Sequence, residues 1–189
     1  MLRPEYPIET VRLTLRPFTE DDFEALYAYQ KLPEVARYLY GGPRDRAETA
    51  EVLKRRVSVR SLEKAGDVLV LAVVLRETGE LVGDVNLAWL SEESKQGEFG
   101  FVFNPAFHGN GYAGEAAVEM LRLGFEGLGL HRIIGRCEGR NTASAKLMAR
   151  LGLRREAHFV QNEFVKGEWN DEIVFAMLAT EWKVPPPRS

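Results

Sequence analysis

The sequence contains one cysteine, Cys137, and only three histidines among its 189 residues. A single cysteine excludes an intrachain disulfide framework and fits a reducing compartment. His108, His131 and His158 lack the spacing of metal ligands, so we predict no metal. No apolar run could span a bilayer, and residues 1–10 lack the basic start and apolar stretch of a signal peptide. We therefore expect a cytoplasmic protein without a membrane partner.

A large excess of one charge is also absent, since 25 Lys and Arg face 28 Asp and Glu, for a net charge of −3. This balance argues against nucleic acid as the primary ligand. A basic stretch does occur within residues 44–64, and it fits either a solvated helix face or a patch that binds a partner. The oligomeric state, monomer or homodimer, stays open.

What is present is the composition of one globular domain, because 45% of the residues are hydrophobic and 28% are charged. We expect a single domain over residues 1–189, with its core at about 11–182 and a flexible tail at 183–189. Alternating and β-rich runs predict strands at 11–18, 68–75, 81–90, 97–103, 131–138, 154–165 and 172–179. Apolar periodicity and capping residues predict helices at 19–30, 44–64, 111–127 and 141–152.

These elements predict an α/β (α+β) chain with antiparallel hairpins. The turn ETGE joins the strands at 68–75 and 81–90, and the turn KGEWND precedes the last strand. The single cysteine falls within the strand at 131–138, where a buried structural thiol is commoner than a nucleophile. We expect Trp182 to pack in the core. We expect Trp169 to lie in a hairpin turn, where it could also border a binding site.

The stretch FNPAFHGNGYAGEA, residues 103–116, holds Gly109, Gly111 and Gly114 in the spacing of a dinucleotide-binding turn. Its context excludes that fold: Pro105 lies between the strand end and the first glycine, and too few βα units follow for a doubly wound sheet. The glycines still permit a tight turn and close approach of a ligand. A helix starting near Gly111 would offer free N–H groups to an anion. A glycine-rich turn that merely enters a helix is the alternative.

Seven stretches carry a resemblance to a known family: RLTLRPF, LPEVARYL, TGELVGDVNL, GEFGFVFNPAFHGNGYAGEA, FEGLGLHRI, RNTASAKLMARLGLRREA and KGEWNDEIVFAMLATEW. In order and spacing, residues 11–182 resemble the GNAT superfamily of acetyl-CoA-dependent N-acetyltransferases. Within it they resemble the RimJ/RimL type, which acetylates ribosomal-protein N-termini. His108 departs from the Gln or Arg that usually begins the superfamily's pyrophosphate loop.

The resemblance implies a GNAT-like domain with a central mixed, mostly antiparallel sheet of about seven strands and helices on both faces. It implies a V-shaped splay between the strand of Phe101 and the strand of Ile133, into which acetyl-CoA fits as co-substrate. The strand residues implied to pair with the pantetheine arm are Phe101, Val102 and Phe103. The loop residues implied to bind the pyrophosphate are His108, Gly109, Asn110, Gly111, Tyr112, Ala113 and Gly114.

Asn141 and Ser144 match the family's Asn-x-x-Ser motif, which contacts the cofactor. The residues support Ser144 independently, because it shares a helical face with Leu147, Met148 and Leu151 and its hydroxyl would need a partner there. A serine bonded back to its own helix is the alternative. Asn141 is first of all a helix cap, and contact with a cofactor would be a second role.

Amide formation from a thioester requires a neutral amine and hence a base. Glu98 stands where several GNAT enzymes carry a catalytic glutamate. Glu163 lies as far from Ser144 as the base proposed for RimL-like enzymes, and we favour it. Each could instead be a solvated strand carboxylate. The leaving thiolate needs less help, since thiols ionise near pH ~8.5, and Ser144 would donate a hydrogen bond to it.

The predicted function is direct acetyl transfer from acetyl-CoA to a primary amine in a ternary complex. The resemblance points to the N-terminal α-amine of a protein or peptide, including a ribosomal protein. A small-molecule amine is the nearest alternative. A non-catalytic module that senses acyl-CoA is an alternative of another class.

Overall fold

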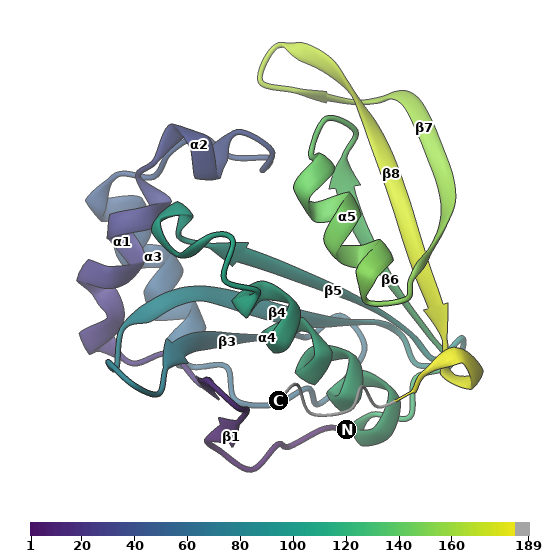
Figure 1. Cartoon of the computed structure of the whole chain (residues 1–189), viewed down its shortest axis with the longest axis horizontal. Helices are drawn as coiled ribbons and strands as arrows, with labels where there is room; N and C mark the ends of the chain where they lie inside the picture. Colours follow the sequence, from purple (N-terminus) through teal and green to yellow (C-terminus); the bar gives the residue numbers. More distant parts are fainter. Residues whose placement is uncertain (184–189) are drawn as a thin grey trace.

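The computed structural model describes residues 1–183, so the tail predicted at 183–189 lies, but for its first residue, outside the described part. Within that part, eight strands form one sheet in the order β1-β2-β3-β4-β5-β6-β8-β7 (Figure 1). The strands are β1 (Ile8–Glu9), β2 (Leu13–Arg16), β3 (Val68–Leu75), β4 (Leu81–Ser91), β5 (Gln96–Phe103), β6 (Arg132–Glu138), β7 (Arg154–Val165) and β8 (Glu168–Leu178). All neighbours pair antiparallel except β5 and β6, which confirms a mixed, mostly antiparallel sheet.

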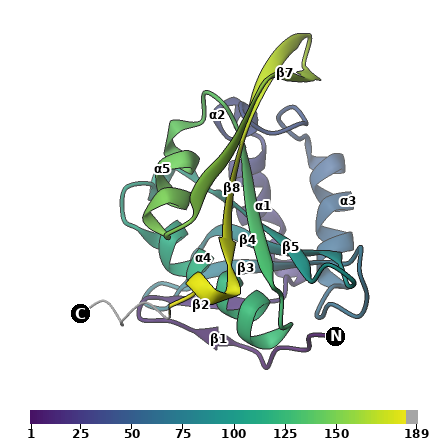
Figure 2. The same cartoon turned by 90° about the vertical axis from the view of Figure 1, so that its right-hand side faces the viewer.

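Helices cover both faces of the sheet, as Figure 2 shows. They are α1 (Phe23–Gln30), α2 (Pro33–Ala36), α3 (Arg46–Val57), α4 (Tyr112–Arg122) and α5 (Thr142–Arg150). A wider π turn at Leu123–Gly127 continues α4 to the end of the predicted helix. Helices α1 and α3 lie on one face, and α4 and α5 on the other. No helix of residues 1–183 has the length and apolar character needed to cross a membrane.

Two apolar clusters account for these two layers. The larger one joins alternate residues of the sheet to α4 and α5 and includes Phe99, Met120 and Met148. The smaller one lies under α1 and α3 and includes Phe18 and Leu26. Strand alternation sends successive side chains to opposite faces, so β3 and β4 supply side chains to both clusters. The same alternation decides which β5 and β6 side chains can reach each side of the site.

The sequence reading differs from the structure in short or polar elements. Strand β1 and helix α2 went unpredicted because two and four residues are too few for a periodicity. The helix predicted at 44–64 ends at Val57, and the chain beyond it pairs with the N-terminal segment through Leu2 and Leu62. The predicted KGEWND turn is only Lys166 and Gly167, since β8 already begins at Glu168.

The parallel pair β5–β6 opens into a V. Pairing covers only Gln96–Glu98 of β5 against Arg132–Ile134 of β6, although β5 continues to Phe103 and β6 to Glu138. Beyond Glu98, β5 stays paired with β4 on its other side. The edge of β5 that faces the opening therefore has unpaired N–H and C=O groups. This confirms the predicted splay between the strands of Phe101 and Ile133.

Candidate active site

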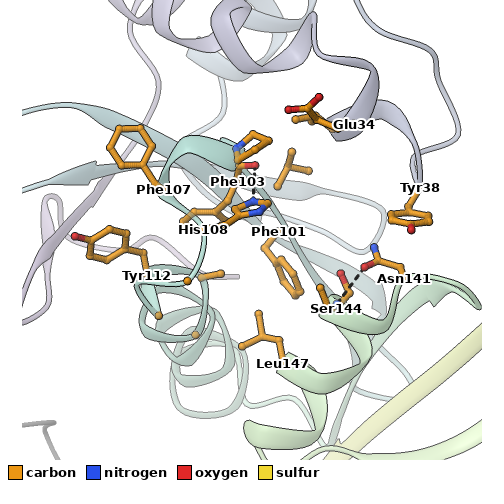
Figure 3. Close-up of a pocket in the computed structure, with 18 of the residues that line it drawn as sticks. Glu34, Tyr38, Phe101, Phe103, Phe107, His108, Tyr112, Asn141, Ser144 and Leu147 are labelled. Atoms are coloured by element: carbon orange, nitrogen blue, oxygen red, sulfur yellow. Dashed lines mark hydrogen bonds between the residues drawn. The ribbon is translucent and has the colours of Figure 1, made fainter.

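A cavity of about 680 Å³ occupies the V between β5 and α5 (Figure 3). Phe101 enters it from β5 and Ser144 from α5, and Leu147 lies between α4 and α5. The lining contains eleven of the twelve predicted cofactor residues: Phe101, Val102, Phe103, His108, Gly109, Gly111, Tyr112, Ala113, Gly114, Asn141 and Ser144. Residues more than forty positions apart in sequence are thus brought to one cavity.

The glycine loop has the geometry that its sequence predicts. Gly109 and Gly111 adopt φ of 83° and 81°, in the left-handed region that side chains other than glycine disfavour. Gly111 is the N-cap of α4, so the first N–H groups of that helix, which have no intrahelical partner, are presented beside the cavity. A Cβ on Gly114 would come within 3.3 Å of Leu147, so this glycine allows α4 and α5 to approach closely.

Arg12 on the N-terminal side of β2 braces the glycine loop from outside. Its Nη1 donates to the carbonyl of Asn110 at 2.9 Å, and its guanidinium lies 4.7 Å from the ring centroid of Tyr112. The same guanidinium pairs with Glu115 in the first turn of α4. Burial opposes the charge of Glu115, but hydrogen bonds from Thr10 and Arg12 outweigh it and hold the pKa of Glu115 below its usual range.

Two loop residues differ in their surroundings. His108 lines the cavity, and its Nε2 lies 3.2 Å from the carbonyl oxygen of Phe103. Asn110 is the one predicted cofactor residue that does not line the cavity. Its amide donates to the carbonyl of Phe107 at 3.1 Å, so this side chain serves the shape of the loop.

Asn141 caps α5, as predicted, because its side chain accepts a hydrogen bond from the N–H of Ser144 at 3.1 Å. Ser144 lies on the first turn of α5 and lines the cavity, while Leu147 and Met148 of the same helix are buried. Among the hydrogen bonds of residues 1–183, none joins the Ser144 hydroxyl back to its own helix. The hydroxyl is therefore available to a ligand in the cavity.

Glu98 lies outside the cavity lining, at the vertex of the V. Arg136 of β6 donates to both of its carboxylate oxygens, at 3.1 and 2.8 Å. The same guanidinium reaches Glu172 of β8 at 3.3 Å, and Asn162 donates to the other oxygen of Glu172 at 3.0 Å. Hydrogen bonding to Glu98 raises the pKa of Arg136, so the guanidinium stays charged. Glu98 is thus held as part of an ion-pair network.

Glu163 also lies outside the lining, on β7. Its Oε1 accepts a hydrogen bond from the Tyr40 hydroxyl at 2.7 Å. Burial, and then this hydrogen bond, raise the pKa of Tyr40 to about 12, so the hydroxyl remains a donor at neutral pH. Glu98 and Glu163 belong to different arms of the V, and each has its own hydrogen-bond partner, Arg136 for Glu98 and Tyr40 for Glu163.

Several cavity residues were missed by sequence reasoning. Glu34, Val35, Tyr38 and Leu39 come from α2 and the turn after it, and Arg150 comes from the last turn of α5. The stretch LPEVARYL carried the only signal, with a proline at the first helical position. Arg150 adds a cation to a cavity lined by a helix N-terminus, which suits an anionic ligand.

Cys137 does not take part in the cavity. Burial raises the pKa of its thiol to about 11, which makes it a poor nucleophile at neutral pH. Trp182 packs against the larger apolar cluster, whereas Trp169 is 60% exposed on the hairpin, where its ring lies 5.3 Å from that of Phe164 at a tilt of 58°. Within residues 1–183, no three His, Cys, Asp or Glu side chains are grouped to hold a metal ion.

Comparison with known proteins gives a consistent result. A family model described as an acetyltransferase (GNAT) domain matches residues 12–154. The uncharacterized N-acetyltransferase YnaD of Bacillus subtilis is 35% identical over 175 residues, which cover 93% of this chain and 98% of the relative. The crystal structure of a GNAT-family acetyltransferase from Bacillus anthracis superposes with a TM-score of 0.83 at 32% identity, covering 92% of this chain and 99% of that chain.

A more distant relative has a stated acceptor. The ribosomal protein uS5 alanine N-acetyltransferase of Escherichia coli is 22% identical over 125 residues, which cover 66% of this chain and 64% of the relative.

Proposed function

The chain belongs to the GNAT family of acetyltransferases and is an acetyl-CoA-dependent N-acetyltransferase, and from that premise we propose that its acceptor is the N-terminal α-amine of a protein or peptide. The uS5 acetyltransferase of Escherichia coli, which acts on a ribosomal protein, supports this acceptor. A ribosomal protein N-terminus in the cytoplasm is accordingly the first substrate to test. The acid–base chemistry agrees. An α-amine has a pKa near ~8, against about 10.4 for the lysine side chain, so a larger fraction of the α-amine is already neutral at physiological pH.

The observation that best supports acetyl transfer at this site is the open V between β5 and β6. The cavity runs from the glycine loop along the unpaired edge of β5, and carboxylates occur on the side of the sheet away from α4 and α5. In our proposal the pyrophosphate of acetyl-CoA binds the N–H groups from Gly109 to Gly114, with Arg150 nearby. The pantetheine arm pairs with Phe101–Phe103 as an added strand.

The transfer step is then direct. The neutral amine attacks the thioester carbonyl carbon, the C–N bond forms, and the C–S bond breaks with its electron pair going to sulfur. Glu163 accepts the proton of the amine, directly or through a water. Ser144 donates a hydrogen bond to the departing thiolate. Glu163 is preferred to Glu98 because Arg136 occupies both oxygens of Glu98, whereas Glu163 has one neutral donor, Tyr40.

A polycationic small amine is the second candidate, favoured by the carboxylates near the V. Glu98, Glu163 and Glu172 supply three carboxylates, of which Glu98 and Glu172 pair with Arg136 while Glu163 is bound by Tyr40. Such a surface attracts a ligand with several ammonium groups.

Mass spectrometry separates the two acceptors. The enzyme is incubated with acetyl-CoA and a panel of peptides with free N-termini, N-terminally blocked lysine peptides, and di- and polyamines. Acetylation of free N-termini but not of blocked peptides supports the proposal. Acetylated polyamines with every peptide unchanged reject the α-amine acceptor.

A further inference from the structure

The two arms of the V meet again at its open end. Strands β2–β5 with α1–α3 form one arm, and β6–β8 with α5 form the other. Beyond Glu98 the paired strands separate, yet Tyr40 on the first arm bonds to Glu163 on the second at 2.7 Å. Nearby, Lys166 Nζ donates to the carbonyl of Ala36 at 2.5 Å. Figures 1 and 2 show the β7–β8 hairpin projecting on the same side as α2.

A bulge in β7 directs Glu163 toward this junction. Phe159 pairs with Glu172 and Glu163 pairs with Asn170, so three residues of β7 stand opposite Asp171 alone. The Asp171 carboxylate accepts from the N–H of Gln161 at 2.9 Å, and Gln161 adopts a φ of 50°. Bulges re-aim side chains beside active sites. The position of Glu163 therefore depends on the bulge from one side and on Tyr40 from the other.

The charged groups around the Tyr40 hydroxyl place it on the side of the V where we propose that the acceptor amine binds. Besides Glu163, the charged groups that act on it are Arg136 and Glu172, from β6 and β8. Tyr40 as a whole is 68% exposed although its hydroxyl is partly desolvated, so packing contributes little to holding this side chain in place. Tyr38 and Leu39, immediately before it, line the cavity. Because Tyr40 is so exposed, its main contact with the rest of the protein is the hydrogen bond from its hydroxyl to the Glu163 carboxylate across the V.

We propose that Tyr40 is a positioning residue: its hydroxyl holds the carboxylate of Glu163 at the acceptor side of the V, so that Glu163 can take the proton of the incoming amine. The inference rests on the proposed role of Glu163 as base and goes beyond it. Tyr40 donates a hydrogen bond and exchanges no proton with the substrate. Its contribution is orientation, which governs the rate of proton transfer more than the binding of acetyl-CoA.

The test is a double-mutant cycle on the full chain, with steady-state kinetics for acetyl-CoA and for the acceptor that the panel identifies. Tyr40→Phe removes only the hydroxyl, and we expect kcat to fall roughly ten- to a hundredfold with KM for acetyl-CoA unchanged, since a misplacement of ~1 Å can cost about 10² in rate. In a Glu163→Gln background, Tyr40→Phe should have almost no further effect, because the group that it positions is gone.

Two controls isolate the role. Tyr27→Phe removes a hydroxyl on α1 that has no hydrogen-bond partner among the described residues, and kcat should stay at the wild-type value. Lys166→Met removes the other bond between the same two segments without touching Glu163, and it should leave kcat within about twofold, as expected for a surface contact.

The outcomes separate the inference from the proposed function. A slow Glu163→Gln enzyme beside a wild-type-like Tyr40→Phe enzyme overturns the role of Tyr40 alone. The same holds if Tyr40→Phe slows the Glu163→Gln enzyme by its full factor, or if Lys166→Met lowers kcat as much as Tyr40→Phe. A Glu163→Gln enzyme with normal kcat overturns the base assignment and the positioning role together.

Discussion

Arg136 binds both carboxylate oxygens of Glu98, across two strands that have just ceased to pair. The last paired residues of the two strands are Glu98 and Ile134, and Arg136 lies two positions beyond the latter. One guanidinium thus joins the arms at the vertex of the V and also reaches Glu172.

The first prediction concerns this network. Arg136→Gln should lower the melting temperature more than Glu98→Gln does, because it leaves the carboxylate of Glu172, which is 7% exposed, without its cation. Glu98→Gln leaves Arg136 paired with Glu172, so a small loss of stability and a small kinetic defect, mainly in acceptor KM, are expected. Calorimetry and kinetics on both variants check this. A larger loss of stability in Glu98→Gln would contradict it.

The second prediction concerns the base. Glu163→Gln should lower kcat by about 10² to 10⁴ while coenzyme A affinity stays nearly unchanged. The deficit should shrink as pH rises, because more of the acceptor amine is then neutral without help. Rates from pH 6 to 10 measure this. A deficit of constant size indicates a positioning role only, and a crippled Glu98→Gln enzyme beside a normal Glu163→Gln enzyme transfers the base to Glu98.

The third prediction concerns the glycine loop. Gly111→Val should weaken coenzyme A binding strongly while the fold is kept, because a β-branched residue resists a φ of 81° and obstructs the approach of phosphate to the main chain. Gly129→Val is the matched control, since Gly129 has a φ of 70°, has no neighbour that a Cβ would meet, and lies away from the cavity. Calorimetric titration with coenzyme A compares them. Normal binding by a folded Gly111→Val protein refutes a phosphate role for the loop.

The fourth prediction concerns the leaving group. Ser144→Ala should reduce kcat about two- to tenfold, because one hydrogen bond contributes roughly 0.5–1.5 kcal/mol and a thiolate is a good leaving group already. Affinity for coenzyme A should change little. Single-turnover rates with acetyl-CoA measure the step. A loss as large as that of Glu163→Gln would instead assign proton transfer to Ser144.

The fifth prediction concerns pH and stability. Asp22, which is buried, accepts hydrogen bonds from Arg16 at 2.8 and 2.7 Å and from the N–H of Thr19 at 2.8 Å. Burial opposes its charge, but these bonds outweigh burial and lower the pKa of Asp22 below its ordinary 3.8. A depressed folded-state pKa stabilises the fold above the unfolded pKa, and this contribution is lost as pH falls through the folded value.

Wild-type protein should therefore exceed Asp22→Asn in unfolding free energy at pH 6, and the gap should narrow below about pH 4. Urea denaturation at several pH values measures the gap. A gap that stays constant down to pH 2 would show that the charge of Asp22 contributes nothing.

Local features of this protein were determined by the sequence itself. The glycines of the loop, the Asn141 cap and the long strands β3, β4 and β7 could be predicted because turn geometry, capping and strand alternation act between residues a few positions apart. The fold and the splay between β5 and β6 could be predicted from the resemblance to the GNAT family, since the matching stretches together span most of the chain.

Only the tertiary structure decided what surrounds each candidate base. Glu98 and Arg136 are 38 residues apart, and Tyr40 and Glu163 are 123 apart, so no local pattern records either contact. The sequence favoured Glu163 only through its spacing from Ser144, and it left a solvated strand carboxylate as the alternative for each glutamate. Where β5 and β6 part, and how the bulge turns β7, determine that one is bound by a cation and the other by a neutral hydroxyl. A carboxylate takes its chemistry from its neighbours, and those neighbours come from chain folding over long sequence distances.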